Sequence, residues 1–291
     1  MNNKRNAFLG AFIGDALALG PHWIYETDKI KKSFGEIKGI VKPLEDTFHK
    51  TKKKGEFTHY GDQMLMLAEF MINNEEGFNK KDFLDFYYDW MQEYNGYLDH
   101  ATKETLSNIE KNKYQGSESE ELAGIISVPV MYYLSDDFKE DAIERTKSTH
   151  NSAIVIDIVS FVVDLLEHIE KGKDIEESIE TLEEKYDSSL GHLVKKARSK
   201  VEEEPIETIK EFGQMCNAEN AFLSSIYLIL KYKDNLKKAL LMNVQAGGDS
   251  AARGIMIGTI LGAYHGIDKL PAEWQEDMKY FEKISSIKKT G

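Results

Sequence analysis

Four glycines near the end of the chain recur at every fourth position, and they constrain its packing strongly. Gly254, Gly258, Gly262 and Gly266 lie in an apolar run that follows residues 247–249. Because residues four apart share one face of a helix, the glycines predict a helix with a bare ridge. A glycine inside a helix costs about 1 kcal/mol relative to alanine, and close approach of a second helix is the usual compensation. We therefore expect this helix to pack tightly against another one.

A second apolar segment lies near the N-terminus. Residues 8–19 carry one ionisable side chain, Asp15, and Gly20 and Pro21 follow. This composition predicts a buried helix that ends at the glycine and proline. A buried carboxylate requires a partner, so Asp15 is a candidate functional residue.

Four polar groups lie at the ends of predicted helices: residues 22–26, 58–63, 149–152 and 247–250. The second group immediately precedes an apolar helix that we expect to start at Met64, and the third precedes a helical run from Ile154. Taken singly, each group is typical of helix capping by Thr, Asp, Asn or Ser. Asp249 likewise has two interpretations, as a helix cap or as a ligand-binding group. Four such groups in one chain favour a shared ligand site.

The remaining sequence indicates an all-α protein with one domain, residues 1–291. No segment shows sustained strand alternation, and no long Gly-rich or Pro-rich linker divides the chain. Pro129 is expected to kink or break its helix. Residues 174–204 have Glu and Lys at helical spacing around an apolar stripe, which is typical of a solvated helix face. Lys52 and its lysine neighbours are expected in a mobile, solvated loop.

Charge and cysteine content exclude several classes of function. The formal net charge of −13 argues against general nucleic-acid binding. The single cysteine, Cys216, excludes an internal disulfide and a cysteine-based zinc site, and a packed thiol is favoured over a nucleophile. No secretory signal or membrane span is visible, so we expect a cytoplasmic protein without membrane contacts.

The two ends of the chain resemble the ADP-ribosylglycohydrolase family, also called the dinitrogenase-reductase-activating glycohydrolase family. The N-terminal match covers residues 10–16, and the C-terminal match runs from 247–249 through the glycine ridge to Pro271 and Trp274. Weaker matches at residues 149–151 and 212–222 follow in the expected order. The resemblance implies an all-helical fold around a central cleft and cleavage of the glycosidic bond between ADP-ribose and a protein side chain or related acceptor.

The resemblance also implies divalent cations, commonly magnesium, but the sequence departs from the family at the ligand positions. The usual Thr, Asp, Asp, Thr run is His59, Tyr60, Gly61, Asp62 here, and the usual Gly, Gly, Asp, Thr, Asp, Thr run is residues 247–252 with alanines at its end. Asp62 and Asp249 remain as candidate magnesium ligands, too few for a paired-metal centre. The acidic residue that family members place after the first motif corresponds to His22, with Glu26 as the alternative.

The candidate site residues follow from these motifs. Hydrolysis of a glycosidic bond needs carboxylates and a group that activates water. The catalytic candidates are Asp15, Asp62, Asp249 and His59. Candidates for binding an ADP-ribose-type ligand by stacking, hydrogen bonds or phosphate contacts are His22, Trp23, Tyr60, Gln63, His150, Asn151, Gly247, Gly248, Ser250 and Arg253.

Three of these assignments have alternatives that the sequence leaves open. Arg253 neutralises a phosphate or pairs with a buried acid such as Asp15. The histidines His22, His59 and His150 are site groups or ordinary buried histidines. The whole chain is a hydrolase of ADP-ribose linkages, or a relative that has lost its chemistry and binds ADP-ribose-like ligands as a regulatory protein.

Overall fold

The computed structural model describes residues 2–74 and 77–288. In this part of the chain the secondary structure is helical, with two isolated bridges and no strand. In chain order the elements are α1 (Asn3–Ala18), α2 (Thr27–Phe34), α3 (His59–Asn73), α4 (Lys80–Glu93), α5 (His100–Glu110), η1 (Leu122–Ile126), α6 (Ser127–Leu134), α7 (Phe138–Thr149), α8 (Ala153–Glu170), α9 (Ile175–Lys185), η2 (Asp187–Gly191), α10 (His192–Ser199), α11 (Pro205–Phe212), α12 (Ala218–Lys231), α13 (Leu236–Gln245), α14 (Ser250–His265), α15 (Ala272–Glu276) and α16 (Phe281–Ser286).

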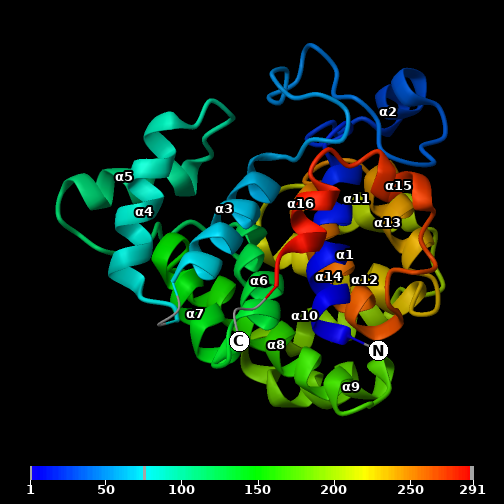
Figure 1. Cartoon of the computed structure of the whole chain (residues 1–291). Coiled ribbons are helices and arrows are strands. Elements are labelled where there is room, and N and C mark those ends of the chain that lie inside the picture. The colour runs from blue at the N-terminus through cyan, green and yellow to red at the C-terminus, as the bar shows by residue number, and fades with distance from the viewer. Residues whose placement is uncertain (1, 75–76, 289–291) are drawn as a thin grey trace.

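Helices α1 and α14 lie side by side at the centre of the molecule (Figure 1). Their glycines face one another, so that the backbones touch at Gly10 with Gly258 and at Gly14 with Gly254. Almost every residue of both helices is buried. The predicted close packing of the glycine ridge is therefore confirmed for Gly254, Gly258 and Gly262, and its partner is the N-terminal helix. Gly266 instead ends α14 as its C-cap, with a φ of 80°.

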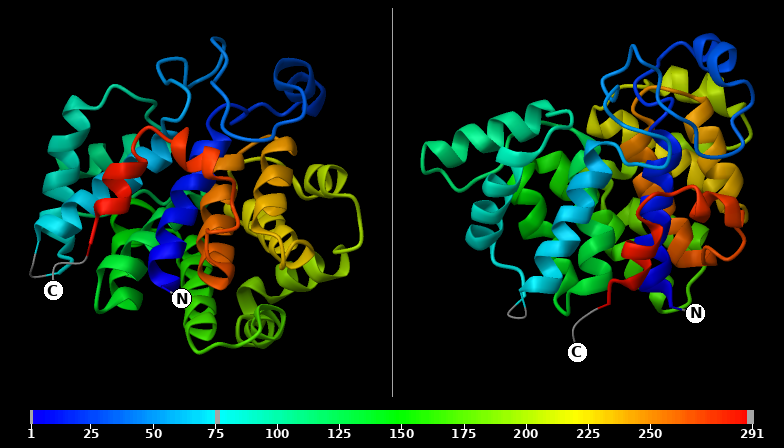
Figure 2. Two further views of the ribbon diagram at one scale, coloured as in Figure 1. Left: turned by 45° about the vertical axis from the view of Figure 1, so that its right-hand side comes forward. Right: turned by 45° about the horizontal axis from the view of Figure 1, so that its top comes forward.

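The other helices surround this pair. Helices α6, α12 and α13 contact it directly, and α8 packs against α14 and also against α7 and α9. Helices α4 and α5 project beside α3 and α7, whereas the long segment 35–58 crosses the end of the molecule at which α1 terminates (Figure 2). The loops that follow α1 and precede α3 and α14 therefore meet at one end of the central pair.

The structure places several helix boundaries differently from the sequence. Helix α3 begins at His59 instead of Met64, because the Thr58 hydroxyl accepts a hydrogen bond from the Tyr60 amide at 3.1 Å and caps the helix there. The 3₁₀ helix η1 changes to α6 just before Pro129, which sits in the first turn of α6, where a missing amide proton is tolerated. In the described ranges no helix is both long enough and apolar enough to cross a membrane.

Candidate active site

Asp15 joins the central helix pair to the start of α3. The side chain is fully buried, and its two oxygens accept hydrogen bonds from the Thr58 hydroxyl at 2.5 Å and the Thr58 amide at 2.9 Å. Burial raises the pKa of Asp15 to about 6, against the opposing effect of the Thr58 hydrogen bonds. The sequence predicted that this buried carboxylate has a partner, and the structure shows that the partner is Thr58, from the polar group at residues 58–63.

The glycine pair before α14 forms a tight turn that is tied to the loop after α1. Gly247 and Gly248 have φ values of 71° and 68°, and a Cβ on Gly248 would lie 2.1 Å from the Gln214 carbonyl oxygen. The Gly248 amide donates to the Ile24 carbonyl at 2.8 Å, and the Gly248 carbonyl accepts from the Trp23 amide at 2.8 Å. The Gly247 amide also donates within the chain. Both glycine amides that the sequence offered to a diphosphate are thus engaged in holding the turn.

Asp249 is both a helix cap and a member of the site. One oxygen accepts from the Ala252 amide at 3.4 Å, a long capping bond, and the other lies 3.4 Å from the Tyr60 hydroxyl. Its carboxylate also lies 3.7 Å from Nδ1 of His22. Burial raises the pKa of Asp249, although the charge of Arg253 opposes the shift. The two readings of this residue are therefore compatible.

Arg253 supports the glycine turn from inside the protein. The guanidinium is fully buried, and it donates to the Asn243 side chain at 2.9 Å and to the Gly247 carbonyl. Asn243 in turn donates to the Ser250 carbonyl at 2.7 Å. The charge of Arg253 acts on Asp249 rather than pairing with Asp15. The residue therefore positions the turn and the start of α14.

Three histidines from three separate segments meet beside Asp249. His22 follows α1, His49 lies in segment 35–58 and His59 starts α3, and all three are almost completely buried. One nitrogen of each ring lies within 4.8 Å of one nitrogen of the others. Burial lowers the pKa of His49 to about 3 and that of His22 well below its usual value, with His49 and His59 adding to the effect on His22. His22 and His49 are therefore neutral at pH 7. Glu26, the alternative to His22, is exposed.

A second carboxylate orients His59. Oδ2 of Asp99 lies 3.2 Å from Nε2 of His59, and the other oxygen of Asp99 accepts from the Thr102 amide at 2.6 Å. Burial by itself raises the pKa of Asp99. The contact with His59 and the hydrogen bond from Thr102 lower it by more, so the net shift is downward. Gln63 reaches the same place, donating to the Thr102 hydroxyl at 3.2 Å.

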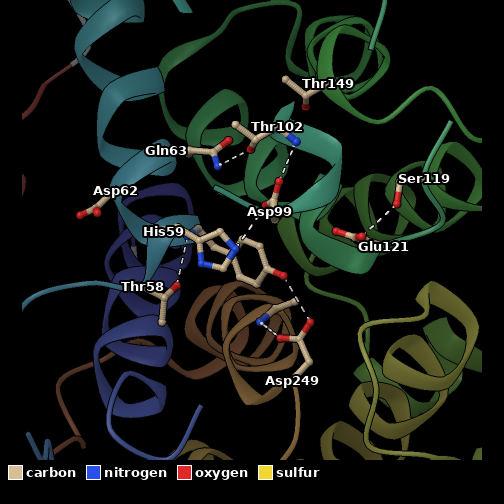
Figure 3. A network of polar contacts seen from close by, with 12 residues as sticks. Thr58, His59, Asp62, Gln63, Asp99, Thr102, Ser119, Glu121, Thr149 and Asp249 are labelled. Carbon is tan, nitrogen blue, oxygen red and sulfur yellow. Dashed lines mark hydrogen bonds and ion pairs between the residues drawn. The ribbon is translucent and has the colours of Figure 1, made fainter. Parts of the chain in front are cut away.

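Asp62 has partners that exclude it from this cluster. Its carboxylate accepts from the Tyr94 hydroxyl at 2.6 Å and from the ammonium of Lys52. Lys52 is largely buried by this contact, so the expected solvated position of this lysine is wrong: an unpaired carboxylate so far from water would be costly. Figure 3 shows Asp62 on the opposite side of His59 from Asp249.

This arrangement bears on magnesium. Magnesium requires several oxygen ligands in octahedral order. Within the described ranges, the ligand atoms of Asp15, Asp62 and Asp249 do not converge, and the one group of three or more metal-binding side chains is His22, His49 and His59. The residues present therefore do not fit a magnesium centre.

The third polar group of the sequence lies partly at the site. His150 is buried, its Nδ1 is 3.0 Å from the Thr149 hydroxyl, and the negative charge of Asp99 acts on it. Burial lowers the pKa of His150 to about 4. Asn151 is exposed, and its amide donates to the Ser117 carbonyl at 2.6 Å. His150 thus backs the site, whereas no hydrogen bond or ion pair joins the Asn151 side chain to the site residues that the structure describes.

Several site residues lack a signal in the sequence. His49 and Phe48 lie in an irregular segment, and Tyr97 and Glu121 belong to loops before α5 and η1. Trp23, Phe48 and Tyr97 form a partly exposed aromatic surface in which each ring centroid lies 5.0–5.3 Å from the other two. Asp99 had one available signal, because it is the N-cap of α5 and accepts from Thr102.

Glu121 completes the acidic side of the site. Burial raises its pKa, and the charges of Asp99 and Asp249 add to the effect. Figure 3 shows the carboxylates of Asp99, Glu121 and Asp249 on the same side of His59. Cys216 lies near the same acids, and burial raises the pKa of its thiol to about 12. A thiol that stays protonated at neutral pH agrees with a packed cysteine rather than a nucleophile.

Comparison with known proteins agrees with this picture. Crystallin J1B of Tripedalia cystophora is 20% identical over 300 residues, covering 94% of this chain and 91% of the crystallin. ADP-ribosylhydrolase ARH3 of Homo sapiens is 27% identical over 91 residues, which are 28% of this chain and 25% of ARH3.

A solved structure described as an ADP-ribosylglycohydrolase-related protein complex has the same fold. Its TM-score is 0.74 at 18% identity, and the match covers 98% of this chain and 95% of that one. The family model for ADP-ribosylglycohydrolase matches residues 2–289. This match spans the central helix pair and every residue of the site, and the chain belongs to the ADP-ribosylglycohydrolase family.

Proposed function

We propose that the protein is a hydrolase that cleaves a glycosidic bond of ADP-ribose attached to a protein side chain or a related acceptor. The observation that carries this proposal is the presence of two buried carboxylate–imidazole pairs at one site. Asp99 lies 3.2 Å from His59, and Asp249 lies 3.7 Å from His22. Buried carboxylates that lie beside imidazoles are concentrated at catalytic sites, because proton transfer needs ionisable groups that are shielded from water and close to one another.

The two carboxylates differ in the way that glycosidic cleavage requires. One group must exchange a proton with the leaving group or with water, and another must remain negative to stabilise the positive ribose of the transition state. The raised pKa of Asp249 suits proton exchange, and the lowered pKa of Asp99 keeps that carboxylate ionised. Burial raises the pKa of the Tyr60 hydroxyl, and the negative charges of Asp249 and Asp99 raise it further. Both carboxylates therefore lie near this hydroxyl.

The aromatic surface at the edge of the site suits the base of ADP-ribose. Phe48 is 61% exposed, and Trp23 and Tyr97 are half-buried. Rings that already pack against one another provide a stacking surface for a purine without a large loss of side-chain entropy. The base would then lie outside the histidines, with the ribose toward Asp249.

The test is an activity assay with the variant Asp249→Asn. Asparagine is as good an N-cap as aspartate, so the change removes the charge and keeps the helix start. We expect wild-type protein to release ADP-ribose from ADP-ribosylated arginine or serine peptides, and the variant to lose at least about 100-fold in kcat. Asp46→Asn, at an exposed aspartate, is the matched control and should retain full activity. Equal activity of Asp249→Asn and wild type would refute the assignment.

Two observations favour a second candidate, a regulatory protein that binds ADP-ribose without cleaving it. Lys52 and Tyr94 occupy the carboxylate of Asp62, and a relative aligned over 94% of the chain is named a crystallin. Calorimetric titration with ADP-ribose separates the two. Binding together with peptide turnover supports the hydrolase, and binding without turnover on any ADP-ribosylated acceptor supports the regulatory protein.

A further inference from the structure

Several buried ring nitrogens of His22, His49 and His59 lack a hydrogen-bond partner among the described residues. Both ring nitrogens of His22, both of His59 and Nε2 of His49 are buried and have no aligned hydrogen bond within the described part of the chain. Leaving one such atom without a partner costs about 1–3 kcal/mol. Nε2 of His59 faces the Asp99 carboxylate at 3.2 Å, and the other four nitrogens in one place indicate a group that the protein binds there.

Ring stacking does not account for these atoms. The rings of His22 and His49 stack on Trp23 with centroids 4.5 and 5.6 Å away. Stacking satisfies the faces of the rings, whereas the nitrogen lone pairs and N–H groups lie at their edges. The edges still need a donor or an acceptor.

The carboxylates behind the cluster lie where the supporting groups of a metal site lie. A histidine that binds a metal through one nitrogen commonly donates its other N–H to a carboxylate, which fixes the ring and its tautomer. Asp99 occupies that place behind His59, and Asp249 lies at 3.7 Å from His22. Asp99 is itself held by the Thr102 amide.

We propose that His22, His49 and His59 form a binding site for one divalent transition-metal ion, with zinc as the best match. Three imidazoles and an open fourth position are a recurring zinc arrangement. Zinc–nitrogen bonds of ~2.0 Å in a tetrahedron place the nitrogens ~3.3 Å apart. Here they lie within 4.8 Å of one another, so small side-chain rotations close the site. Imidazole is a poor ligand for magnesium and a good one for zinc, cobalt, nickel and copper.

This proposal is independent of the proposed hydrolase activity, because it concerns the ion alone. A bound ion would satisfy three buried nitrogens whether or not ADP-ribose is cleaved.

The experiment is a titration of the full chain, without a histidine tag and stripped by a chelator, with Co²⁺. Cobalt reports its geometry, because four-coordinate sites absorb visible light far more strongly than octahedral ones. We expect one Co²⁺ per chain with the intense four-coordinate spectrum and stoichiometric displacement by Zn²⁺. Millimolar Mg²⁺ should leave the spectrum unchanged. No cobalt binding, an octahedral spectrum or displacement by Mg²⁺ would overturn the proposal.

Three variants locate the ion. His49→Gln lies in an irregular segment and removes a ligand without altering a helix, so its fold should persist by circular dichroism. Its affinity for Co²⁺ should fall by more than the roughly 10- to 100-fold expected for Asp99→Asn, which removes only a supporting group. His192→Gln, at an exposed histidine on α10, is the matched control and should bind as wild type. Unchanged Co²⁺ affinity in His49→Gln would refute the site.

Discussion

Gly10 and Gly258 touch through their backbones across the α1–α14 interface. A Cβ on Gly10 would lie 2.2 Å from the Gly258 carbonyl oxygen, and a Cβ on Gly258 would lie 2.1 Å from the Gly10 carbonyl oxygen. This contact sets the distance between α1, which carries Asp15, and α14, which Asp249 caps at its N-terminus. The geometry of the site therefore depends on glycines that no ligand touches.

Gly258→Ala should destabilise the protein. The added methyl meets backbone atoms that cannot rotate away, so we expect overpacking to cost about 3 kcal/mol, more than the ~1 kcal/mol that alanine gains in a helix. Urea unfolding followed by circular dichroism measures the change. Gly39→Ala is the control, because its Cβ would meet only the Trp274 side chain, at 3.1 Å and beyond. Equal stability of Gly258→Ala and wild type would mean that the helices separate freely.

The stability of the protein should fall between about pH 4 and pH 6 because of Asp15. The unfolded chain releases this proton near its ordinary pKa of 3.8, whereas the folded protein retains it up to about 6. The folded state therefore binds more protons than the unfolded state in this window. As the pH rises, the free energy of unfolding falls by about 3 kcal/mol.

Asp15→Asn removes this titration. Its free energy of unfolding should fall less between about pH 4 and pH 6 than that of wild type, whatever constant cost the substitution adds. Urea unfolding at several pH values gives both curves. Parallel curves for the two proteins would show that Asp15 does not titrate in this range.

Lys52→Met should destabilise the start of α3. It leaves the carboxylate of Asp62 largely buried with only the Tyr94 hydroxyl as a partner, at an expected cost of about 3 kcal/mol. Thermal unfolding measures the loss. Lys53→Met changes an exposed neighbour and should have almost no effect. A Lys52→Met protein as stable as the Lys53→Met protein would contradict the buried ion pair.

Asn243→Ala should weaken the turn before α14. The change leaves one N–H of the buried Arg253 guanidinium without a partner and removes the side-chain bond to the Ser250 carbonyl, so we expect a loss of about 3 kcal/mol. Asn73→Ala, whose side chain donates to the Glu69 carbonyl at the surface, is the matched control. Thermal unfolding of both variants tests this; similar melting temperatures would show that the buried network contributes little.

Local sequence patterns predicted a large share of the fold and part of the site. The glycine spacing from Gly254 onward predicted a helix with a bare face, and the lone charge of Asp15 in an apolar run predicted a buried, partnered carboxylate. Asp249 was recognisable as a cap, whereas the helix after Thr58 was expected to start only at Met64. These features are readable because helix periodicity and capping act over a few neighbouring residues.

Only the tertiary structure decided what the polar residues do. Asp15 meets Thr58 and not Arg253, Asp62 is taken by Lys52, and His49 and Asp99 join His59 from segments that lack a motif. These contacts join residues 10 to 43 positions apart, and which of them form depends on how the long loops cross the end of the α1–α14 pair. The sequence thus determined the helices and their buried faces, because those follow from local spacing. Which side chains meet at the site depended on the paths of the loops, and local residue spacing does not specify those paths.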